Sequence, residues 1–336
     1  MNCPNCGNFI RNPINFCPYC RAPLNAVVPS LIEIRHKRKP GKTVMIALIL
    51  LFIAFAAYHY KGSKILTFVE TMFSRVGNIK GTDSRISASA PAAQGDIPMP
   101  KPPEKYTDPV TGIDFVFVRG GCYRMGDVFG DGDADEKPPH EVCVNDFYMS
   151  KFEVTQGQWV TLMGKNPSSF AGGKSYPVEK ISWQDTQNFI NVLKKKNSVA
   201  KFRLPTEAEW EYACRSGGKD EKWAGTGKEA TLGEYAWSDL NSGGKPHPVG
   251  SAKPNGLGLY DMSGNVWEWV EDDYAPDCYQ DQEKDNPICI RGRGGNRVIR
   301  GGNWYLSSRF ARCTARSSAP SSGSAYSVGF RLVREK

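Results

Sequence analysis

The chain has 336 residues, which predicts two or three domains rather than one. With 40% hydrophobic and 11% aromatic residues it has the composition of a globular protein, which excludes a disordered chain. The net charge of +8 is unevenly divided. Residues 1–42 hold seven of the 43 Lys and Arg residues and only one of the 35 Asp and Glu residues. The rest of the chain therefore carries a net charge of only +2. That remainder lacks the basic excess of nucleic-acid-binding proteins, and no nucleic-acid partner is expected.

Two C-x-x-C pairs open the chain, with ten residues between them. Four thiolates at this spacing suit a tetrahedral zinc site. A segment this short cannot build an adequate apolar core, so the metal would supply its folding free energy. We therefore predict a four-cysteine zinc ribbon over residues 1–24, with Zn²⁺ bound by Cys3, Cys6, Cys17 and Cys20. Its role stays open between binding a cytosolic protein partner and a structural function.

A basic segment and an uncharged apolar run follow the ribbon. Residues 43–60 are long enough for a short transmembrane helix, since a spanning helix needs about 17–25 apolar residues. The juxtamembrane segment, residues 25–42, places five Lys and Arg close to this run, whereas Lys61 and Lys64 lie on its other side. The positive-inside rule then puts the N-terminus in the cytosol. We expect a single-pass protein of the bacterial inner membrane whose C-terminal domain is periplasmic.

The remaining chain divides into a linker and a globular domain. Residues 61–105 form a membrane-proximal segment and a linker rich in Pro, Ala, Ser and Gly, and residues 106–336 form the domain. Helices are predicted at 182–196, after the N-cap candidate Ser182, and at 206–215, which opens with a Thr-x-x-Glu capping box. Short β-like runs are predicted at 115–119, 141–147 and 298–300.

Eight motifs follow one another between residues 113 and 334. They include F-V-F-V-R-G-G-C-Y-R-M-G, R-L-P-T-E-A-E-W-E-Y-A-C-R, N-G-L-G-L-Y-D-M-S-G-N-V-W-E-W and V-I-R-G-G-N-W. In this order they resemble the formylglycine-generating enzyme family, also called sulfatase-modifying factor domains. The resemblance implies the family's fold, an α+β domain related to C-type lectins with little regular secondary structure. It also implies that most Trp, Gly and Arg residues of these motifs build the fold.

The same resemblance implies a calcium site in segment 261–268. Calcium takes six to eight oxygen ligands, which alternate residues of an irregular loop can supply. The implied ligands are the carboxylates of Asp261 and Glu268 and the carbonyl oxygens of Gly264 and Val266. A capping and turn role for the two carboxylates is the alternative.

Six cysteines lie in the domain and can pair in 15 ways. We expect three disulfides, the first implied by the resemblance and the other two joining neighbouring segments: Cys214–Cys313, Cys122–Cys143 and Cys278–Cys289. Disulfides and zinc thiolates call for different redox compartments, which the predicted membrane would separate.

The resembled enzymes oxidise a cysteine of unfolded sulfatases, using two cysteines that hold copper(I) downstream of R-G-G-S. Here Asn303 replaces the serine, and Leu306 stands where the first cysteine would be. No cysteine lies between Cys289 and Cys313, and the resemblance assigns Cys313 to a disulfide. The family's copper site therefore cannot form, and we expect neither copper nor formylglycine synthesis.

Two functions from different classes remain. The first is a non-catalytic module that binds an exported peptide, glycan or protein. Its groove would lie in a segment rich in Ser, Tyr and Asn that related variable proteins diversify, at Asn303, Trp304, Tyr305, Leu306 and Arg309. The alternative is an oxidoreductase of the formylglycine-generating or nonheme-iron type that modifies an exported substrate. The family's iron branch uses three histidines, whereas this domain has only His140 and His247. These residues favour the binding module but leave catalysis open.

Overall fold

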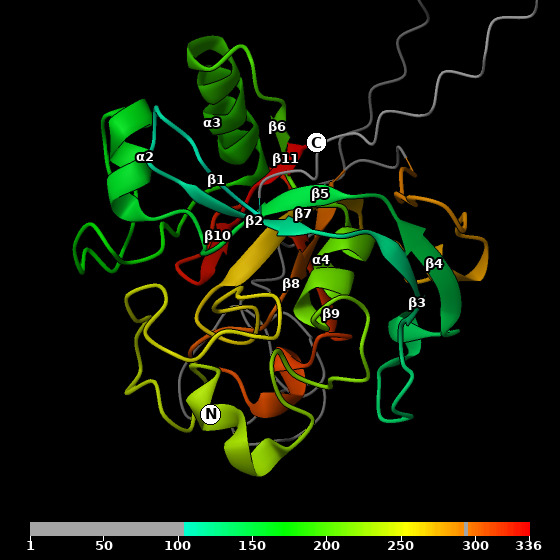
Figure 1. The fold of residues 1–336 in the computed structure, drawn as a ribbon. Helices are drawn as coiled ribbons and strands as arrows, with labels where there is room; N and C mark the ends of the chain where they lie inside the picture. Colours follow the sequence, from blue (N-terminus) through cyan, green and yellow to red (C-terminus); the bar gives the residue numbers. More distant parts are fainter. Residues whose placement is uncertain (1–103, 292–294) are drawn as a thin grey trace, which may run out of the picture. The chain divides into compact units, whose positions relative to one another are not determined.

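The structure is a computed structural model that describes residues 104–291 and 295–336. The predicted zinc ribbon at residues 1–24 and the predicted transmembrane helix at 43–60 lie outside the described residues. Among the residues described, no helix is long and apolar enough to cross a membrane. They form an α+β domain in which long loops join short strands and helices, as the sequence predicts (Figure 1).

The larger sheet is antiparallel, with its strands in the order β1-β2-β5-β11-β6. They are β1 (Lys105–Thr107), β2 (Asp114–Val118), β5 (Phe147–Ser150), β6 (Phe202–Arg203) and β11 (Val333–Glu335). In β11, Val333 lies opposite Met149 on one side and opposite Arg203 on the other. The end of the chain therefore completes the sheet that its first strands begin.

A second sheet has the strand order β10-β7-β8-β9. Its strands are β7 (Trp267–Asp273), β8 (Asn296–Arg300), β9 (Arg316–Pro320) and β10 (Val328–Phe330). β10 runs parallel to β7, and the other two pairs are antiparallel. The loops that follow β8 and precede β10 carry most of the residues of the candidate site.

A separate hairpin is formed by β3 (Gly121–Met125) and β4 (His140–Val144). Cys122 lies directly opposite Cys143 in this hairpin, and a disulfide joins them. The strand predicted at 141–147 is two strands, because residues between β4 and β5 interrupt it and β5 pairs in the five-stranded sheet. The other two predicted runs correspond to β2 and β8.

Helix α3 (Trp183–Lys196) begins at the predicted N-cap. The hydroxyl of Ser182 accepts a hydrogen bond from the amide of Asp185 at 3.1 Å, and the Asp185 carboxylate accepts one from the amide of Ser182 at 2.9 Å. This capping box satisfies amides that a helix start leaves free. On the buried face of α3, the ring of Phe189 stacks on Trp159 of a neighbouring helix at a centroid distance of 5.3 Å.

Helix α4 (Glu207–Cys214) also begins at its predicted capping box, with Thr206 as the N-cap. The whole helix is buried, including its three glutamates. Buried charges require partners, and arginines from the strands supply them: Arg316 for Glu207, Arg203 for Glu209 and Arg300 for Glu211. These ion pairs join the helix to β6, β8 and β9.

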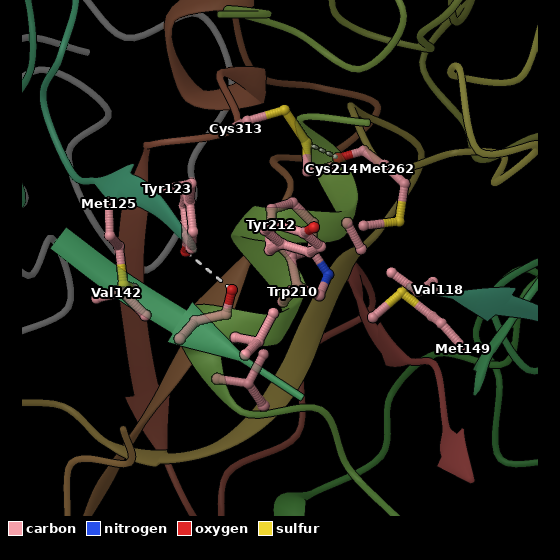
Figure 2. Packing of buried hydrophobic residues seen from close by; sticks show 14 of the residues in the cluster. Val118, Tyr123, Met125, Val142, Met149, Trp210, Tyr212, Cys214, Met262 and Cys313 are labelled. Carbon is pink, nitrogen blue, oxygen red and sulfur yellow. Dashed lines mark hydrogen bonds between the residues drawn. A yellow bond between two sulfur atoms is a disulfide. The ribbon is translucent and has the colours of Figure 1, made fainter. Parts of the chain in front are cut away.

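Figure 2 shows the hydrophobic cluster that surrounds α4. Trp210 is fully buried in it, and the hydroxyl of Tyr123 donates a hydrogen bond to the carbonyl oxygen of Ala208 at 2.9 Å. The disulfide between Cys214 and Cys313 lies in the same cluster. It therefore connects the end of α4 to the loop that follows β8.

The sequence predicts no helix over α2 (Gln156–Met163). Thr155 and Gln158 form its capping box, in the same pattern as the two predicted helices. Among the described residues there are also four 3-10 helices: η1 (Ala134–Glu136), η2 (Glu229–Glu234), η3 (Cys278–Gln280) and η4 (Ser308–Ala311).

A buried carboxylate beside α4 leads to a prediction about pH. Asp272 accepts hydrogen bonds from the amides of Glu207 and Cys289, both at 2.7 Å. Burial, together with the charge of Glu207, raises the pKa of Asp272 to about 7. Since the unfolded pKa is about 3.9, the native state binds the proton more tightly. This contribution to stability is complete below about pH 4 and is lost as the pH rises to about 7.

We therefore expect the Asp272→Asn variant to lack one component of the pH dependence of unfolding. Across that pH window the free energy of unfolding of the native chain should fall relative to the variant, by up to about 1.4 kcal/mol for each pH unit. Urea unfolding at pH 4, 5, 6 and 7 measures the difference in slope, with Asp273→Asn as the neighbouring control. Parallel pH profiles for Asp272→Asn and the native chain would contradict it.

Candidate ligand-binding site

The segment that carries the predicted groove begins with a tight turn after β8. Gly301 and Gly302 have φ angles of 97° and 75°, a region that favours glycine. At Gly302, a Cβ atom would lie only 2.8 Å from the carbonyl oxygen of Phe310. The two glycines let the chain turn so that Asn303 and Trp304, which follow, are buried.

Trp304 belongs to a group of four side chains that we call the aromatic cluster: Phe170, Trp304, Tyr305 and Tyr326. The ring centroid of Trp304 lies 5.3 Å from that of Phe170, 4.8 Å from that of Tyr305 and 6.1 Å from that of Tyr326. The ring of Tyr326 lies 5.9 Å from Tyr305 and 6.3 Å from Phe170. Phe170 and Tyr305 are half-buried, and Tyr326 is exposed. The cluster therefore presents three accessible rings beside one buried indole.

Backbone hydrogen bonds from distant segments hold the cluster in place. The amide of Trp304 donates to the carbonyl oxygen of Asn265 at 2.8 Å, and its carbonyl accepts from the hydroxyl of Ser242 at 2.6 Å. The amide of Phe170 donates to the Glu179 carboxylate at 2.7 Å. The site is thus fixed by residues that are far apart in the sequence.

Three buried polar atoms at the cluster have no hydrogen-bond partner within the described residues. They are Nδ2 of Asn303, Nε1 of Trp304 and Oε2 of Glu179. Burial also raises the pKa of Glu179. An unsatisfied buried polar group costs about 1–3 kcal/mol, and such groups in native proteins are usually bonded to water or a ligand. Their concentration here makes the cluster the candidate binding site.

The predicted groove residues do not all meet at the cluster. Asn303, Trp304 and Tyr305 lie together there. Leu306 follows directly, and its carbonyl oxygen accepts a hydrogen bond from the amide of Asp239 at 3.1 Å. Arg309 instead forms an ion pair with Asp133 at 2.6 Å.

Sequence reasoning did not find Phe170, Glu179 or Tyr326 as site residues. Tyr326 lies in the Ser- and Tyr-rich segment already noted, so composition gave a weak signal for it. Phe170 and Glu179 precede the segment by more than 120 residues. They reach the cluster because the loop after α2 folds back on Trp304, which no local pattern indicates.

The cysteines of the described domain are all in disulfides, in the three expected pairs: Cys122–Cys143, Cys214–Cys313 and Cys278–Cys289. Leu306, at the position of the family's first copper ligand, provides a hydrocarbon side chain where that chemistry needs a thiolate. The described residues therefore offer copper(I) no pair of thiolates.

The two histidines of the domain each lie in a hydrogen-bonded setting. His140 contacts the Gln282 side-chain oxygen through Nε2 at 2.8 Å. His247 stacks on Trp237 at a centroid distance of 3.7 Å and contacts the carbonyl oxygen of Ser242 at 2.8 Å. Across residues 104–291 and 295–336, no group of three or more His, Cys, Asp and Glu side chains is arranged to hold a metal ion.

Three predicted calcium ligands, Asp261, Gly264 and Val266, lie on the turn that leads into β7, and Glu268 lies in β7 itself. The set fits a cation only in part. Oδ2 of Asp261 accepts the amide of Gly250 at 2.7 Å, while Oδ1 is buried without a partner. Both oxygens of Glu268 are already engaged by Arg331 at 2.7 Å, and one also accepts from the indole of Trp210 at 2.7 Å. The carbonyls of Gly264 and Val266 belong to the same turn. Asp261 thus keeps one buried oxygen without a partner, whereas Glu268 is held by Arg331.

A third buried carboxylate, Glu153, was not predicted to belong to this group. It accepts hydrogen bonds from the amide of Val266 at 3.1 Å and from the Asn265 side chain at 2.6 Å. Burial raises the pKa of Glu153 well above its usual range, the charges of Asp261 and Glu268 raise it further, and Arg331 opposes them. Burial likewise raises the pKa of Asp261 to about 6.

The charges of this group do not balance. Three ionised carboxylates would face one arginine, leaving two negative charges uncompensated in a buried place. Desolvation makes such an excess costly unless the carboxyls bind protons or a cation. A divalent cation would neutralise it, and Oδ1 of Asp261 is the oxygen free to bind one.

A cavity of about 620 Å³ lies elsewhere, over the start of α2 and the loop that follows it. Its lining includes Gln156, Gly157, Gln158 and Lys174 but no member of the aromatic cluster. The first amides of α2 are already bonded to Tyr176, Lys174 and Thr155. These amides are therefore not free to bind a ligand in this cavity.

Comparisons with known proteins place the chain among relatives with different names. Residues 101–336 match the family described as "Sulfatase-modifying factor enzyme 1-like domain". The chaperone protein LppX of Paenibacillus barcinonensis is 28% identical, over 66% of this chain and 90% of that protein. The formylglycine-generating enzyme of Streptomyces coelicolor is 29% identical, over 66% of this chain and 88% of that protein. The solved structure of Treponema denticola variable protein 1 is 31% identical, with a TM-score of 0.62 over 69% of this chain and 98% of the other.

Proposed function

The chain belongs to the family of sulfatase-modifying factor enzyme 1-like domains, and on that premise we propose that it is a non-catalytic member, which binds an exported peptide, glycan or protein through the aromatic cluster. One observation carries the proposal. The family's oxidation needs two free thiolates, but Leu306 occupies the first position and the six cysteines of the domain are paired in disulfides.

The chemistry of the cluster supports a binding role. Tyr and Trp side chains provide large contact areas with a polar end, which is why they are enriched where proteins bind partners. Here three accessible rings lie beside buried polar atoms that have no partner. The names of the relatives include both an enzyme and a binding protein: the Streptomyces protein is named for formylglycine generation, and the Paenibacillus protein is named a chaperone.

Two measurements on the full-length chain test the proposal. The first offers it a cysteine-containing sulfatase peptide with copper(I) and oxygen, and mass spectrometry of the peptide should show no formylglycine. The second screens peptide and glycan arrays with the native chain and with Tyr305→Ala. Binding of at least one array ligand should be lost in the variant. Peptide oxidation, or stoichiometric copper or iron after loading, would instead support the alternative, an oxidoreductase that modifies an exported substrate.

Calcium is proposed as the ion of the outer domain, held by Asp261 with the carbonyl oxygens of Gly264 and Val266. Glu268 would contribute its charge and, if Arg331 releases an oxygen, a further ligand. Calcium supplies two positive charges and accepts an irregular set of oxygens. The charge excess of the three buried carboxylates supports this assignment.

Removing calcium should therefore destabilise the domain. With free calcium at about 100 times its Kd, the free energy of unfolding should be about 2.7 kcal/mol higher than in a chelator. In Asp261→Asn that difference should largely disappear, because the variant removes the negative charge of the carboxylate that would bind the ion. Thermal unfolding with and without calcium measures it, with Asp273→Asn as a control that keeps the response. An unchanged Tm of the native chain would contradict the assignment.

The N-terminal part of the proposal rests on sequence alone. We place a zinc ribbon at residues 1–24, a single transmembrane helix at 43–60 and the domain outside the bacterial inner membrane. The ribbon would recruit a cytosolic protein partner while the outer domain meets an exported one. Zinc content of the full-length chain and protease access to the domain in spheroplasts test the two parts separately. If deletion of residues 1–24 leaves every interaction unchanged, the recruiting role is wrong.

A further inference from the structure

Helix α3 ends in a turn of exposed lysines. Its last residues are Lys194, Lys195 and Lys196, and all three side chains are exposed. None of the three forms an ion pair with a residue that the structure describes. Leu193 and Asn197, on either side of them, are buried, so the backbone of this turn is held against the domain while its charges face the solvent.

The loop that follows α3 continues this surface. Val199 is 92% exposed, and the side chain of Lys201 is 81% exposed. We call the four lysines of the turn and the loop, together with this valine, the basic edge: Lys194, Lys195, Lys196, Val199 and Lys201.

Two carboxylates adjoin the basic edge, and both also have an arginine partner. Glu335 lies 3.6 Å from Lys201 and 3.5 Å from Arg203. Burial raises the pKa of Glu271, and a hydrogen bond from a glutamine and the charges of two arginines and Lys194 oppose that rise. The carboxylates therefore do not neutralise the four lysines, and the edge keeps a positive charge.

The basic edge lies beside the first strand of the domain. The side-chain amide of Asn197, the C-cap of α3, donates to the hydroxyl of Tyr106 at 3.0 Å and to the carboxylate of Asp108 at 2.7 Å. Tyr106 belongs to β1, where the proposed linker joins the domain. Figure 1 shows α3 next to β6, the strand that Lys201 precedes. The lysines thus surround the point at which a membrane anchor would be attached.

The helix dipole explains only part of this pattern. Cations are stabilising near the C-terminus of a helix, but the effect falls off within the last turn. Val199 and Lys201 lie beyond the C-cap, so the dipole accounts for neither of them. An exposed valine among lysines instead suits a surface that offers both negative charge and an apolar layer.

The composition of the basic edge favours a lipid surface over a protein partner. Protein–protein interfaces are enriched in Arg and aromatic residues and depleted in Lys. A lysine ammonium is a compact, hydrated charge on a flexible apolar stem. Such charges suit the spread negative charge of anionic headgroups, which attracts basic residues close to a membrane.

We propose that the basic edge docks on anionic phospholipid headgroups, with Val199 at the boundary between headgroups and acyl chains. This inference rests on the transmembrane anchor of the proposed function, because four lysines alone make a weak contact that a tether strengthens by raising its effective concentration. The contact determines which face of the domain lies against the membrane, and salt weakens it by screening.

The experiment reconstitutes the full-length chain in vesicles of phosphatidylcholine, or of phosphatidylcholine and phosphatidylglycerol in equal parts. A membrane-impermeant amine reagent then acylates the outward-facing domains under single-hit conditions, and mass spectrometry gives the rate at each lysine. Residues 194–196 and Lys201 should react about threefold more slowly in the anionic vesicles, and concentrated sodium chloride should remove the difference. Lys228, an exposed lysine outside the basic edge, should react equally in both.

A triple variant and a control matched in charge locate the contact. In Lys194→Gln/Lys195→Gln/Lys196→Gln, Lys201 should lose its protection by anionic vesicles. The control, Lys219→Gln/Lys245→Gln/Lys284→Gln, removes three exposed lysines elsewhere and should keep it. Circular dichroism confirms that both variants are folded.

Flotation of the chain with phosphatidylcholine vesicles in concentrated salt tests the anchor separately. If the chain floats but its lysines react equally in both kinds of vesicle, the anchor stands and the inference is wrong. If it does not float there, the anchor is wrong, and the inference holds only if the chain floats with anionic vesicles at low salt and the basic-edge variant does not. Unchanged protection of Lys201 in the basic-edge variant overturns the inference in either case.

Discussion

Replacing Arg331 with methionine is expected to lower the free energy of unfolding by about 3–5 kcal/mol, because the change leaves buried carboxylates without their cation. Arg331 is fully buried and binds both oxygens of Glu268 at 2.7 Å. It also donates to the carbonyl oxygens of Ser150 at 3.1 Å and Tyr260 at 2.8 Å. A methionine fills much of the same space but satisfies none of these acceptors.

Urea unfolding followed by circular dichroism measures this loss. Arg331→Lys should recover little of it, since a lysine cannot make the paired contact with one carboxylate and still reach the two carbonyl oxygens. Arg309→Met removes an exposed arginine from a single ion pair and should cost less than about 1 kcal/mol. A loss below about 1 kcal/mol for Arg331→Met would show that Glu268 does not depend on this arginine.

The same variant separates two explanations of the buried charge. In Arg331→Met the carboxylates of Glu153, Asp261 and Glu268 lose Arg331, the cation that acts on all three among the described residues. If calcium binds at Asp261, it should recover part of the lost stability, and its Tm shift should be larger in the variant than in the native chain. If the carboxyls instead take up protons, stability should be recovered by lowering the pH, with or without calcium.

The sequence predicted helices correctly where the signal was local. The capping boxes at Ser182 and Thr206 lie within four residues of each helix start, and both helices begin there. Thr155 carries the same pattern for α2, but Gly157 stands in the first turn of that helix. Glycine lowers helix propensity by about 1 kcal/mol, so the apolar pattern alone was too weak to indicate it.

The candidate site was predictable only where it is continuous in sequence. Asn303, Trp304 and Tyr305 follow a recognisable motif and lie together in the structure. Phe170 and Tyr326 join them through tertiary packing of two loops, which has no periodic signature. The same holds for the buried charges, since a local motif contains a carboxylate but not the distant arginine that neutralises it.

Loss of the Cys214–Cys313 disulfide is the second change expected to have a large effect. The two cysteines are 99 residues apart in sequence. In the chain-entropy account, closing a loop of about 100 residues stabilises the native state by about 4.7 kcal/mol, against about 3 kcal/mol for a loop of about 15 residues. The double variant Cys214→Ala/Cys313→Ala should therefore lose about 4–5 kcal/mol.

The Cys278–Cys289 disulfide provides a matched control. Its cysteines are also buried, but they are only 11 residues apart. The cost of replacing buried sulfur by alanine is similar in both double variants, so it largely cancels in their comparison. A difference of about 2 kcal/mol between the two, measured by urea unfolding under non-reducing conditions, would then report the loop length. Equal losses would show that local packing, rather than chain entropy, determines the contribution of each disulfide.

The two disulfides should also differ in their effect on binding. Cys313 follows the loop that carries Trp304 and Tyr305, and its amide donates to the carbonyl oxygen of Lys222 at 2.8 Å. Without its bond to Cys214, this loop loses its covalent attachment to α4 and therefore a constraint on the aromatic cluster. Affinity for an array ligand whose binding depends on Tyr305 should fall in the Cys214→Ala/Cys313→Ala variant even at a temperature where it is folded, and stay unchanged in the Cys278→Ala/Cys289→Ala variant. Equal affinity in both would mean that the glycine turn and the hydrogen bonds to Asn265 and Ser242 are sufficient to hold the cluster in place.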